Sequence, residues 1–228
     1  MPAAALGLLA VLLALVAASF LADSVPTPPP AASTVPSAHA ASEPPASATP
    51  RTDEVVGYGA DTVGGSGGEV LTVSTADELR AALEASGPRI VTFDVPSSGA
   101  TLRFDERITV VNPKVTIDGS TSAGPVTLRG WLVFTTSEVI IRDVRIRPGD
   151  IGDDNMDDRE ALTINGRETP VSDFIIDGVS MMWGPDVGGI SLLGDVRDVT
   201  VQYSIIGPGL HLSKHSEGTE ERGGHSYA

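Results

Sequence analysis

From residue 89 onward, apolar and polar positions alternate in short runs that end at Gly, Asn, Asp or Pro. Alternation with a period of two predicts strands that bury one face. One such run recurs as VTIDG, VIIRD, FIIDG and VTVQY, whose first residues Val115, Val139, Phe174 and Val199 lie 24, 35 and 25 positions apart. A repeat of this length indicates a solenoid, in which neighbouring coils bury one another's apolar faces.

Each coil is expected to hold two or three short strands. The predicted ranges are 69–74, 90–95, 101–104, 108–111, 114–118, 126–128, 131–134, 139–146, 161–164, 174–176, 179–182, 189–192 and 199–206. A β-sandwich is the alternative for a chain with many short strands. It accounts for the turns but not for the repeat of 24 residues.

A single helix is predicted from residue 76 to about 85. Thr75 and Glu78 have the spacing of a capping box, and Leu79, Ala82 and Leu83 form an apolar stripe. We expect this helix to cover the open end of the stack, where unpaired strand edges would otherwise be exposed. The glycine-rich residues 57–68 before it predict an irregular segment.

The N-terminal quarter of the chain has a different composition. Residues 1–21 are apolar and predict a signal peptide or an N-terminal anchor, and residues 22–52 predict a disordered linker rich in Pro, Ala and Ser. Residues 53–228 are then one domain. The protein is expected to be secreted or tethered to the extracellular surface, with membrane contact only through that anchor.

Acidic residues outnumber basic ones by 30 to 15, which gives a net charge of −15. Nucleic acid is therefore not an expected partner, because phosphate binding needs a basic face. Six acids lie between residues 150 and 160, inside the longest step of the repeat. A loop that grows out of a rigid coil is a usual place for function.

Several segments in this order resemble secreted bacterial pectate lyases of the right-handed parallel β-helix type. They are GYGADTVGGSGG at 57–68, SGPRIVTFDV at 86–95, VIIRDVRIRPGD at 139–150, MWGPD at 182–186 and LSKHSEG at 212–218. The resemblance implies an all-β fold, a right-handed parallel β-helix with one N-terminal capping helix. It also implies cleavage of an acidic polysaccharide such as polygalacturonate by calcium-assisted β-elimination.

The same resemblance implies a Ca²⁺ site. Asp158 and Glu160 match the first ligand segment of the family, Asp186 matches the second, and Val187 stands where a further acid often follows. Asp158 and Glu160 are two positions apart, so on a strand both would face the same side. Asp186 could meet them from the next coil. The alternative interpretation is that the whole loop is solvated, and Asp153, Asp154 and Asp157 are each expected to be solvated rather than to bind a metal.

The elimination also needs a base within hydrogen-bond reach of the proton that is removed. The family uses an arginine from a coil beyond the metal site, and this chain lacks the matching segment. Lys214 and His215 are the leading candidates for this base, and Arg222 and His225 are weaker candidates.

Two arginines precede the acidic segment in the sequence, and one tryptophan follows it. Arg145 and Arg147 are candidates for binding the carboxylates of the substrate, since a guanidinium group can hold a carboxylate with two hydrogen bonds. Trp183 is expected to be a packing residue rather than a platform for a sugar.

The leading hypothesis is a monomeric polysaccharide lyase. The first alternative is a non-catalytic β-helix at the cell surface that binds acidic glycans. The second is a glycoside hydrolase, which would use a pair of carboxylates such as Asp153-Asp154 and Asp157-Asp158.

Overall fold

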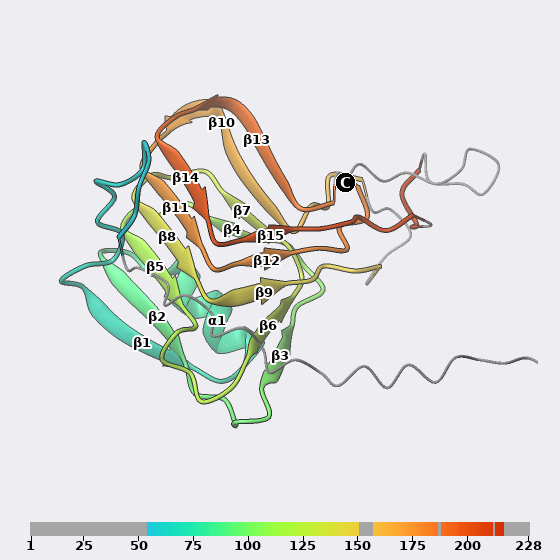
Figure 1. Ribbon diagram of the computed structural model, residues 1–228, viewed down its shortest axis with the longest axis horizontal. Coiled ribbons are helices and arrows are strands. Elements are labelled where there is room, and N and C mark those ends of the chain that lie inside the picture. Colours follow the sequence, from blue (N-terminus) through green and yellow to red (C-terminus); the bar gives the residue numbers. More distant parts are fainter. Residues whose placement is uncertain (1–53, 151–156, 187, 212, 217–228) are drawn as a thin grey trace, which may run out of the picture. The chain divides into compact units, whose positions relative to one another are not determined.

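The computed structural model describes residues 54–150, 157–186, 188–211 and 213–216. The predicted signal or anchor and the linker lie outside these residues, as do Asp153, Asp154, Val187, Arg222 and His225. The described part of the chain winds into a right-handed parallel β-helix (Figure 1). The predicted fold class is therefore confirmed.

Three parallel sheets form the faces of the β-helix. Sheet A contains β1 (Glu69–Val73), β2 (Arg89–Phe93), β5 (Val115–Asp118), β8 (Val139–Arg142), β11 (Phe174–Asp177) and β14 (Val199–Gln202). Sheet B contains β3 (Ala100–Arg103), β6 (Val126–Arg129), β9 (Val144–Ile146), β12 (Ser180–Met181) and β15 (Ile205–Ile206). Sheet C contains β4 (Ile108–Val110), β7 (Leu132–Phe134), β10 (Leu162–Val171) and β13 (Ile190–Val196).

The repeat in the sequence is the register of sheet A. Val115, Val139, Phe174 and Val199 are Cα partners on consecutive strands β5, β8, β11 and β14. The longer step of the repeat does not disturb this register, because its extra residues lie in the loop between β9 and β10. The acidic loop is thus an outgrowth of a regular coil.

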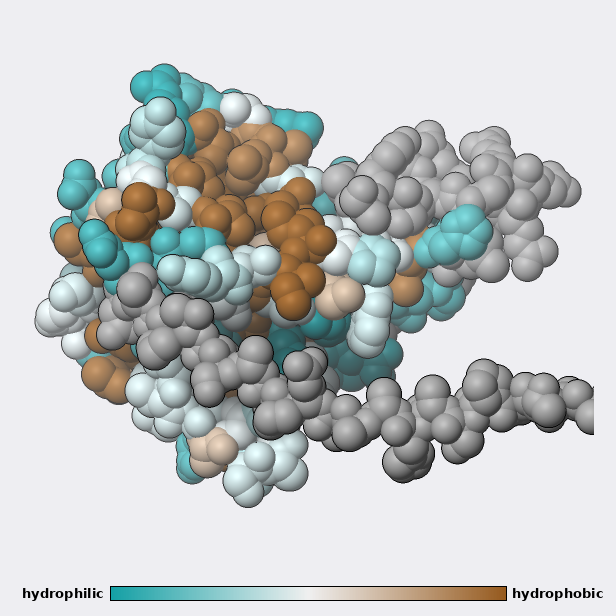
Figure 2. Space-filling model, viewed as in Figure 1, coloured by the Kyte–Doolittle hydropathy of each residue, from teal (hydrophilic) through white to brown (hydrophobic). Residues whose placement is uncertain are grey.

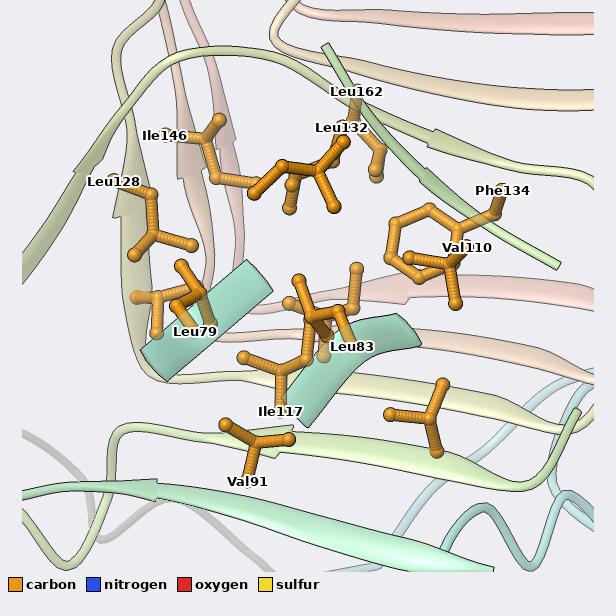
Figure 3. Packing of buried hydrophobic residues seen from close by; sticks show 14 of the residues in the cluster. Leu79, Leu83, Val91, Val110, Ile117, Leu128, Leu132, Phe134, Ile146 and Leu162 are labelled. Carbon is orange, nitrogen blue, oxygen red and sulfur yellow. The ribbon is translucent and has the colours of Figure 1, made fainter. Parts of the chain in front are cut away.

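Helix α1 (Ala76–Glu84) contacts β1, β2 and β4. Its capping box is present, because the Thr75 hydroxyl accepts from the Glu78 amide and the Glu78 carboxylate accepts from the Thr75 amide. Leu79 and Leu83 are completely buried and point into the cluster of apolar side chains inside the β-helix (Figure 3). The helix covers this end of the core, as predicted.

Arg89 joins the helix to the first coils, a role that the sequence did not reveal. Its side chain is completely enclosed, with the residue only 1% exposed, and burial lowers the pKa of its guanidinium group. Its donors reach five backbone carbonyls, those of Ala82 and Leu83 in the last turn of α1 and those of Gly87, Asn112 and Pro113. A buried cation at a helix C-terminus is thus satisfied by carbonyl groups alone.

Residues 54–68, which we call the strap, cross the outer face of sheet A from β14 toward β1 (Figure 1). The amide of Gly59 donates to the Thr200 hydroxyl (2.9 Å), and the amide of Gly65 donates to the Thr116 hydroxyl (3.0 Å). Glycine is required for this close approach, since a Cβ on Gly65 would lie 1.8 Å from the carbonyl oxygen of Arg89. The predicted irregular segment is therefore an ordered cover over sheet A.

Two predicted strands are each divided by a tight turn. The predicted strand 139–146 separates into β8 and β9 at Asp143 (φ 54°), and 199–206 separates into β14 and β15 at Tyr203 (φ 49°). A positive φ at a residue other than glycine is uncommon. The sequence pattern therefore predicts one continuous strand where the structure has two strands and a turn. As a result, Arg142 lies on sheet A, whereas Arg145 lies on sheet B.

The last described coil lies at the other end of the stack from α1. It exposes Leu192, Val201, Ile205 and Ile206, and Figure 2 shows apolar side chains gathered over β13, β14 and β15. The described residues leave this apolar surface uncovered. Among the described residues, no helix has the length and hydropathy of a membrane span.

Candidate functional site

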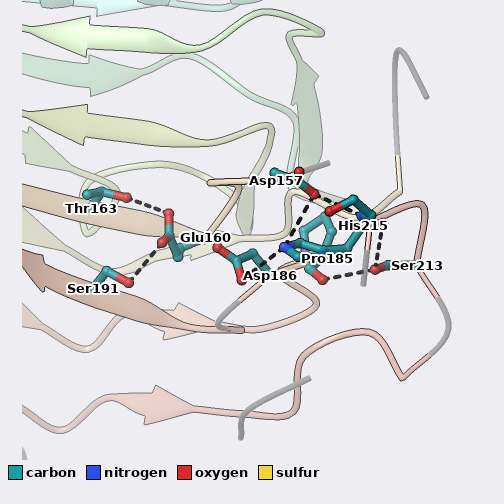
Figure 4. A network of polar contacts seen from close by, with 9 residues as sticks. Asp157, Glu160, Thr163, Pro185, Asp186, Ser191, Ser213 and His215 are labelled. Atoms are coloured by element: carbon teal, nitrogen blue, oxygen red, sulfur yellow. Dashed lines mark hydrogen bonds and ion pairs between the residues drawn. The ribbon is translucent and has the colours of Figure 1, made fainter. Parts of the chain in front are cut away.

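Three side chains from distant parts of the chain meet beside sheet C (Figure 4). Asp157 precedes β10, Asp186 lies between β12 and β13, and His215 lies in the C-terminal segment. Nε2 of His215 is 3.3 Å from Oδ1 of Asp157 and 3.4 Å from Oδ1 of Asp186. We call these three residues the Asp-His cluster.

The backbone around His215 is tied to both loops. The Ser213 hydroxyl donates to the Pro185 carbonyl (2.9 Å) and accepts from the His215 amide (3.2 Å), and the Ser216 amide donates to Oδ1 of Asp157 (2.8 Å). The His215 side chain is only 8% exposed, whereas that of Asp157 is 35% exposed. The imidazole is therefore held in place on several sides.

Glu160 lies near the cluster but is occupied by other partners. Its two carboxylate oxygens accept from the Thr163 hydroxyl (2.8 Å) and the Ser191 hydroxyl (2.9 Å), which are register partners on β10 and β13. The residue is 5% exposed. Through these two hydrogen bonds, Glu160 anchors the start of β10 to β13.

The predicted calcium ligands are thus not arranged as an oxygen cage. Asp158 is exposed in a turn (φ 61°), Glu160 is held by hydroxyls, and Asp186 contacts His215. Within the described ranges, no three His, Asp or Glu side chains are grouped so that they could hold a metal ion. Calcium takes six to eight oxygen ligands at about 2.3–2.6 Å, and between Asp157 and Asp186 that space holds an imidazole nitrogen. The oxygen chemistry suits calcium, whereas the arrangement does not.

The two candidate bases have different surroundings. Lys214 is exposed, and its only hydrogen bond with the described residues runs from its backbone amide to Oδ1 of Asp150 (3.2 Å). His215 belongs to the Asp-His cluster. Both residues lie in a C-terminal segment whose backbone binds Asp150 and Asp157 of the acidic loop. Of the two, His215 has the side chain that is held by other residues.

Arg147 and Trp183 form a second feature, on the side of sheet B. The guanidinium group of Arg147 donates to the carbonyls of Ile146 and Ser180 and to the Ser180 hydroxyl. Its central carbon lies 5.4 Å from the centroid of the Trp183 ring, a cation–π distance. Trp183 is 49% exposed, so the packing expected for it is only partial. Its backbone has φ 65°, which turns the chain outward after β12.

No family model matches the chain. Curated proteins described as probable pectate lyase C match it over 162 residues, which cover 68% of this chain. The identities are 37% for Aspergillus terreus, 39% for Aspergillus flavus and 36% for Emericella nidulans. Over these residues, the chain is similar to pectate lyases. It spans only 35–36% of the length of these relatives.

In this pectate lyase relative, sequence reasoning missed one member of the site. Asp157 was expected to be solvated, but its carboxylate contacts His215 and the Ser216 amide. The resemblance instead predicts that the neighbouring Asp158 is a calcium ligand. Asp157 is distinguished from Asp158 by its contact with a residue 58 positions away, and no local pattern shows such a contact.

Proposed function

We propose that this pectate lyase relative acts as a polysaccharide lyase on an acidic polysaccharide such as polygalacturonate. The observation that carries the proposal is the identity of 36–39% to proteins named as pectate lyases, over a stretch that covers 68% of the chain. The β-helix and its acidic loop support it, because a rigid scaffold with one enlarged loop is a usual way to position catalytic groups.

The proposed reaction is a β-elimination on a uronate residue. A base removes the proton on C5, next to the carboxylate; the electron pair forms the C4–C5 double bond, the C4–O glycosidic bond breaks, and the departing oxygen takes a proton. The carboxylate must be neutralised while C5 carries negative charge. Arg145 and Arg147 are assigned to binding uronate carboxylates elsewhere along the polymer, because a guanidinium group can donate two hydrogen bonds to a carboxylate.

We further propose that the base is His215, with Lys214 as the alternative. When Nε2 of His215 carries a proton toward Asp157 and Asp186, Nδ1 has the free electron pair that can accept a proton. Carboxylates that orient an imidazole in this way are a recurrent arrangement for general bases. The short distances to both carboxylates support this orientation.

Calcium, with Asp158, Glu160 and Asp186 as ligands, stays a prediction of the sequence. When bound, such an ion would neutralise the uronate carboxylate and stabilise the enolate. Since the described arrangement gives Asp186 and Glu160 other partners, we derive no step through calcium. The proposal also places the protein outside the cell, as a secreted or tethered monomer.

The second candidate function is a non-catalytic β-helix that binds acidic glycans. The Asp-His cluster favours it, because the carboxylates of Asp157 and Asp186 both face an imidazole that is almost fully covered. An arrangement of this kind can be a structural clasp between the last coil and the acidic loop.

A lyase assay separates the two. The full chain is incubated with polygalacturonate, with added calcium and with a chelator, and the ultraviolet absorbance of the unsaturated product is followed. The lyase proposal predicts an increasing absorbance that His215→Ala abolishes, while circular dichroism shows that the variant stays folded. A flat trace from a folded sample that still binds the polymer supports the second function, and a flat trace without binding contradicts both.

A further inference from the structure

The outer face of sheet B is basic, although the protein as a whole is strongly acidic. Arg103, Arg129 and Arg145 are exposed on β3, β6 and β9, and Arg147 follows β9 directly. Arg103 and Arg129 are register partners, and Arg147 comes next in the same row, since Leu128 pairs with Ile146. The five strands of this sheet contain no acidic residue.

This face is hollowed into a groove. One depression of about 330 Å³ is lined by Thr101, Thr127, Arg129, Arg147, Gly149 and Trp183. A second, of about 260 Å³, shares the two threonines and adds Arg145 among its lining residues. The shared threonines join the two into one groove that crosses β3, β6 and β9. Its lining offers cations, hydroxyl groups and one aromatic ring.

Arg147 has N–H groups that can bind an anion. Three of its five N–H groups are used by Ile146 and Ser180, and the Nε–H and one Nη2–H, which lie along one edge of the guanidinium plane, have no hydrogen-bond partner among the described residues. That edge can hold a carboxylate with two parallel hydrogen bonds. Burial, and then the charge of Arg145, lower the pKa of Arg147. A bound carboxylate would offset both causes, because an opposite charge favours the charged guanidinium group.

Trp183 is held at the end of this groove by its backbone. Its amide donates to the Pro208 carbonyl (2.8 Å), and its carbonyl accepts from the Gly149 amide (3.0 Å). These bonds fix a positive φ that costs free energy at a residue other than glycine. The ring is half exposed beside Arg147. An exposed aromatic face next to a cation suits the flat apolar face of a sugar that carries a carboxylate.

We propose that this groove is a binding site for a linear, carboxylate-bearing polysaccharide, separate from the Asp-His cluster. Neighbouring strands of a parallel sheet are about 4.8 Å apart, so arginines on successive coils present a row of cations to a repeating polyanion. The choice of a uronate polymer rests on the proposed function. The net charge of −15 argues against nucleic acid, which is bound through a broad basic surface.

Binding is tested without catalysis. Galacturonate oligomers are titrated into the full chain by isothermal titration calorimetry in the presence of a chelator, with neutral cello-oligosaccharides and single-stranded DNA as comparison ligands. Arg129→Gln and Trp183→Ala are each expected to weaken oligogalacturonate binding roughly five- to tenfold, through loss of a charge-assisted hydrogen bond or of ring contact. Arg197→Gln is the matched control, because Arg197 is an exposed arginine paired with Asp195 outside the groove.

The proposal holds if galacturonate oligomers bind more tightly than the neutral glycan and DNA and only the groove variants weaken that binding. It is overturned if both groove variants bind like the parent, if Arg197→Gln weakens binding equally, or if either comparison ligand binds as tightly. Binding without elimination would refute the lyase proposal and leave this one standing. Elimination by the parent protein, together with unchanged oligogalacturonate affinity in both groove variants, would refute this proposal alone.

Discussion

Replacing His215 by alanine tests whether the imidazole acts as the internal partner of two carboxylates. Nε2 of His215 lies 3.3 and 3.4 Å from Oδ1 of Asp157 and Asp186. Removal of the ring leaves both carboxylates facing an emptied space. Because they are partly exposed, with side chains 35% and 15% accessible, water can replace some of the lost interaction. We therefore expect the free energy of unfolding to fall by about 1–3 kcal/mol.

The same substitution should create a cation site. An ion at the position of Nε2 needs oxygen at about 2.3–2.6 Å, so each carboxylate must approach by about 0.8 Å, a movement that small rotations of a side chain supply. In the parent protein calcium has to displace the imidazole first. We expect calcium to stabilise His215→Ala more than the parent, by up to about 2.7 kcal/mol when free calcium exceeds the dissociation constant a hundredfold.

Urea denaturation followed by circular dichroism, with and without calcium, measures both effects. His211→Ala is the control, since His211 is exposed and makes no hydrogen bond or ion pair with the described residues. Magnesium is the control ion, because it keeps its water shell more strongly than calcium does. The role of His215 as the partner of both carboxylates is refuted if calcium stabilises the parent and His215→Ala equally. It is also refuted if His211→Ala destabilises the protein as much as His215→Ala does.

Three further predictions concern the scaffold. Thr116→Val and Thr200→Val should each lower the free energy of unfolding by about 1–3 kcal/mol, because each leaves a covered strap amide without its acceptor. Thr72→Val, on an uncovered part of sheet A, is the control and should lower it less in the same urea titrations. Equal losses would show that the strap amides do not need these hydroxyls. Arg89→Met should cost about 3 kcal/mol or more, since it leaves several buried carbonyls without donors, and a change of the melting temperature within error would contradict that role. Hydrogen bonds from Ser74 and Thr75 lower the pKa of Glu78 below 4.5, so its contribution to stability is complete above that value and is lost as the pH falls through the folded pKa. Glu78→Gln keeps the hydrogen bonds of the cap, and its difference in stability from the parent should shrink in acid; a difference that does not change with pH would contradict this.

The regular part of the β-helix could be predicted because stacking makes it repetitive. Val115, Val139, Phe174 and Val199 occupy equivalent inward positions, so the same side-chain chemistry recurs at the coil spacing. The capping box of α1 is equally visible, because it depends on residues three positions apart. Both signals are local or periodic.

The features that the sequence did not reveal depend on contacts between distant segments. Arg89 is buried by carbonyls from three separate stretches of chain, and the strap buries the outer row of sheet A from about 50 to 140 positions away. This cover explains why β5, β8 and β11 are buried on both faces, whereas an open sheet would show polar outer residues. The pairing of Asp157 with His215 is of the same kind. Patterns along the chain cannot show which segment covers which face.

The β-helix also explains how one acidic chain can carry surfaces of opposite sign. Each coil passes through three sheets, so residues of one kind can be confined to one face simply by recurring at one position of the coil. Arginines recur on sheet B, while the acids of the long loop gather before sheet C, where His215 contacts two carboxylates. A polyanion is repelled by the molecule as a whole and attracted by one groove, which favours binding in a single orientation. Arg129→Gln should therefore reduce affinity most at low ionic strength, where the charge of the groove is least screened, and an effect that does not change between low and high salt would count against a role for that charge.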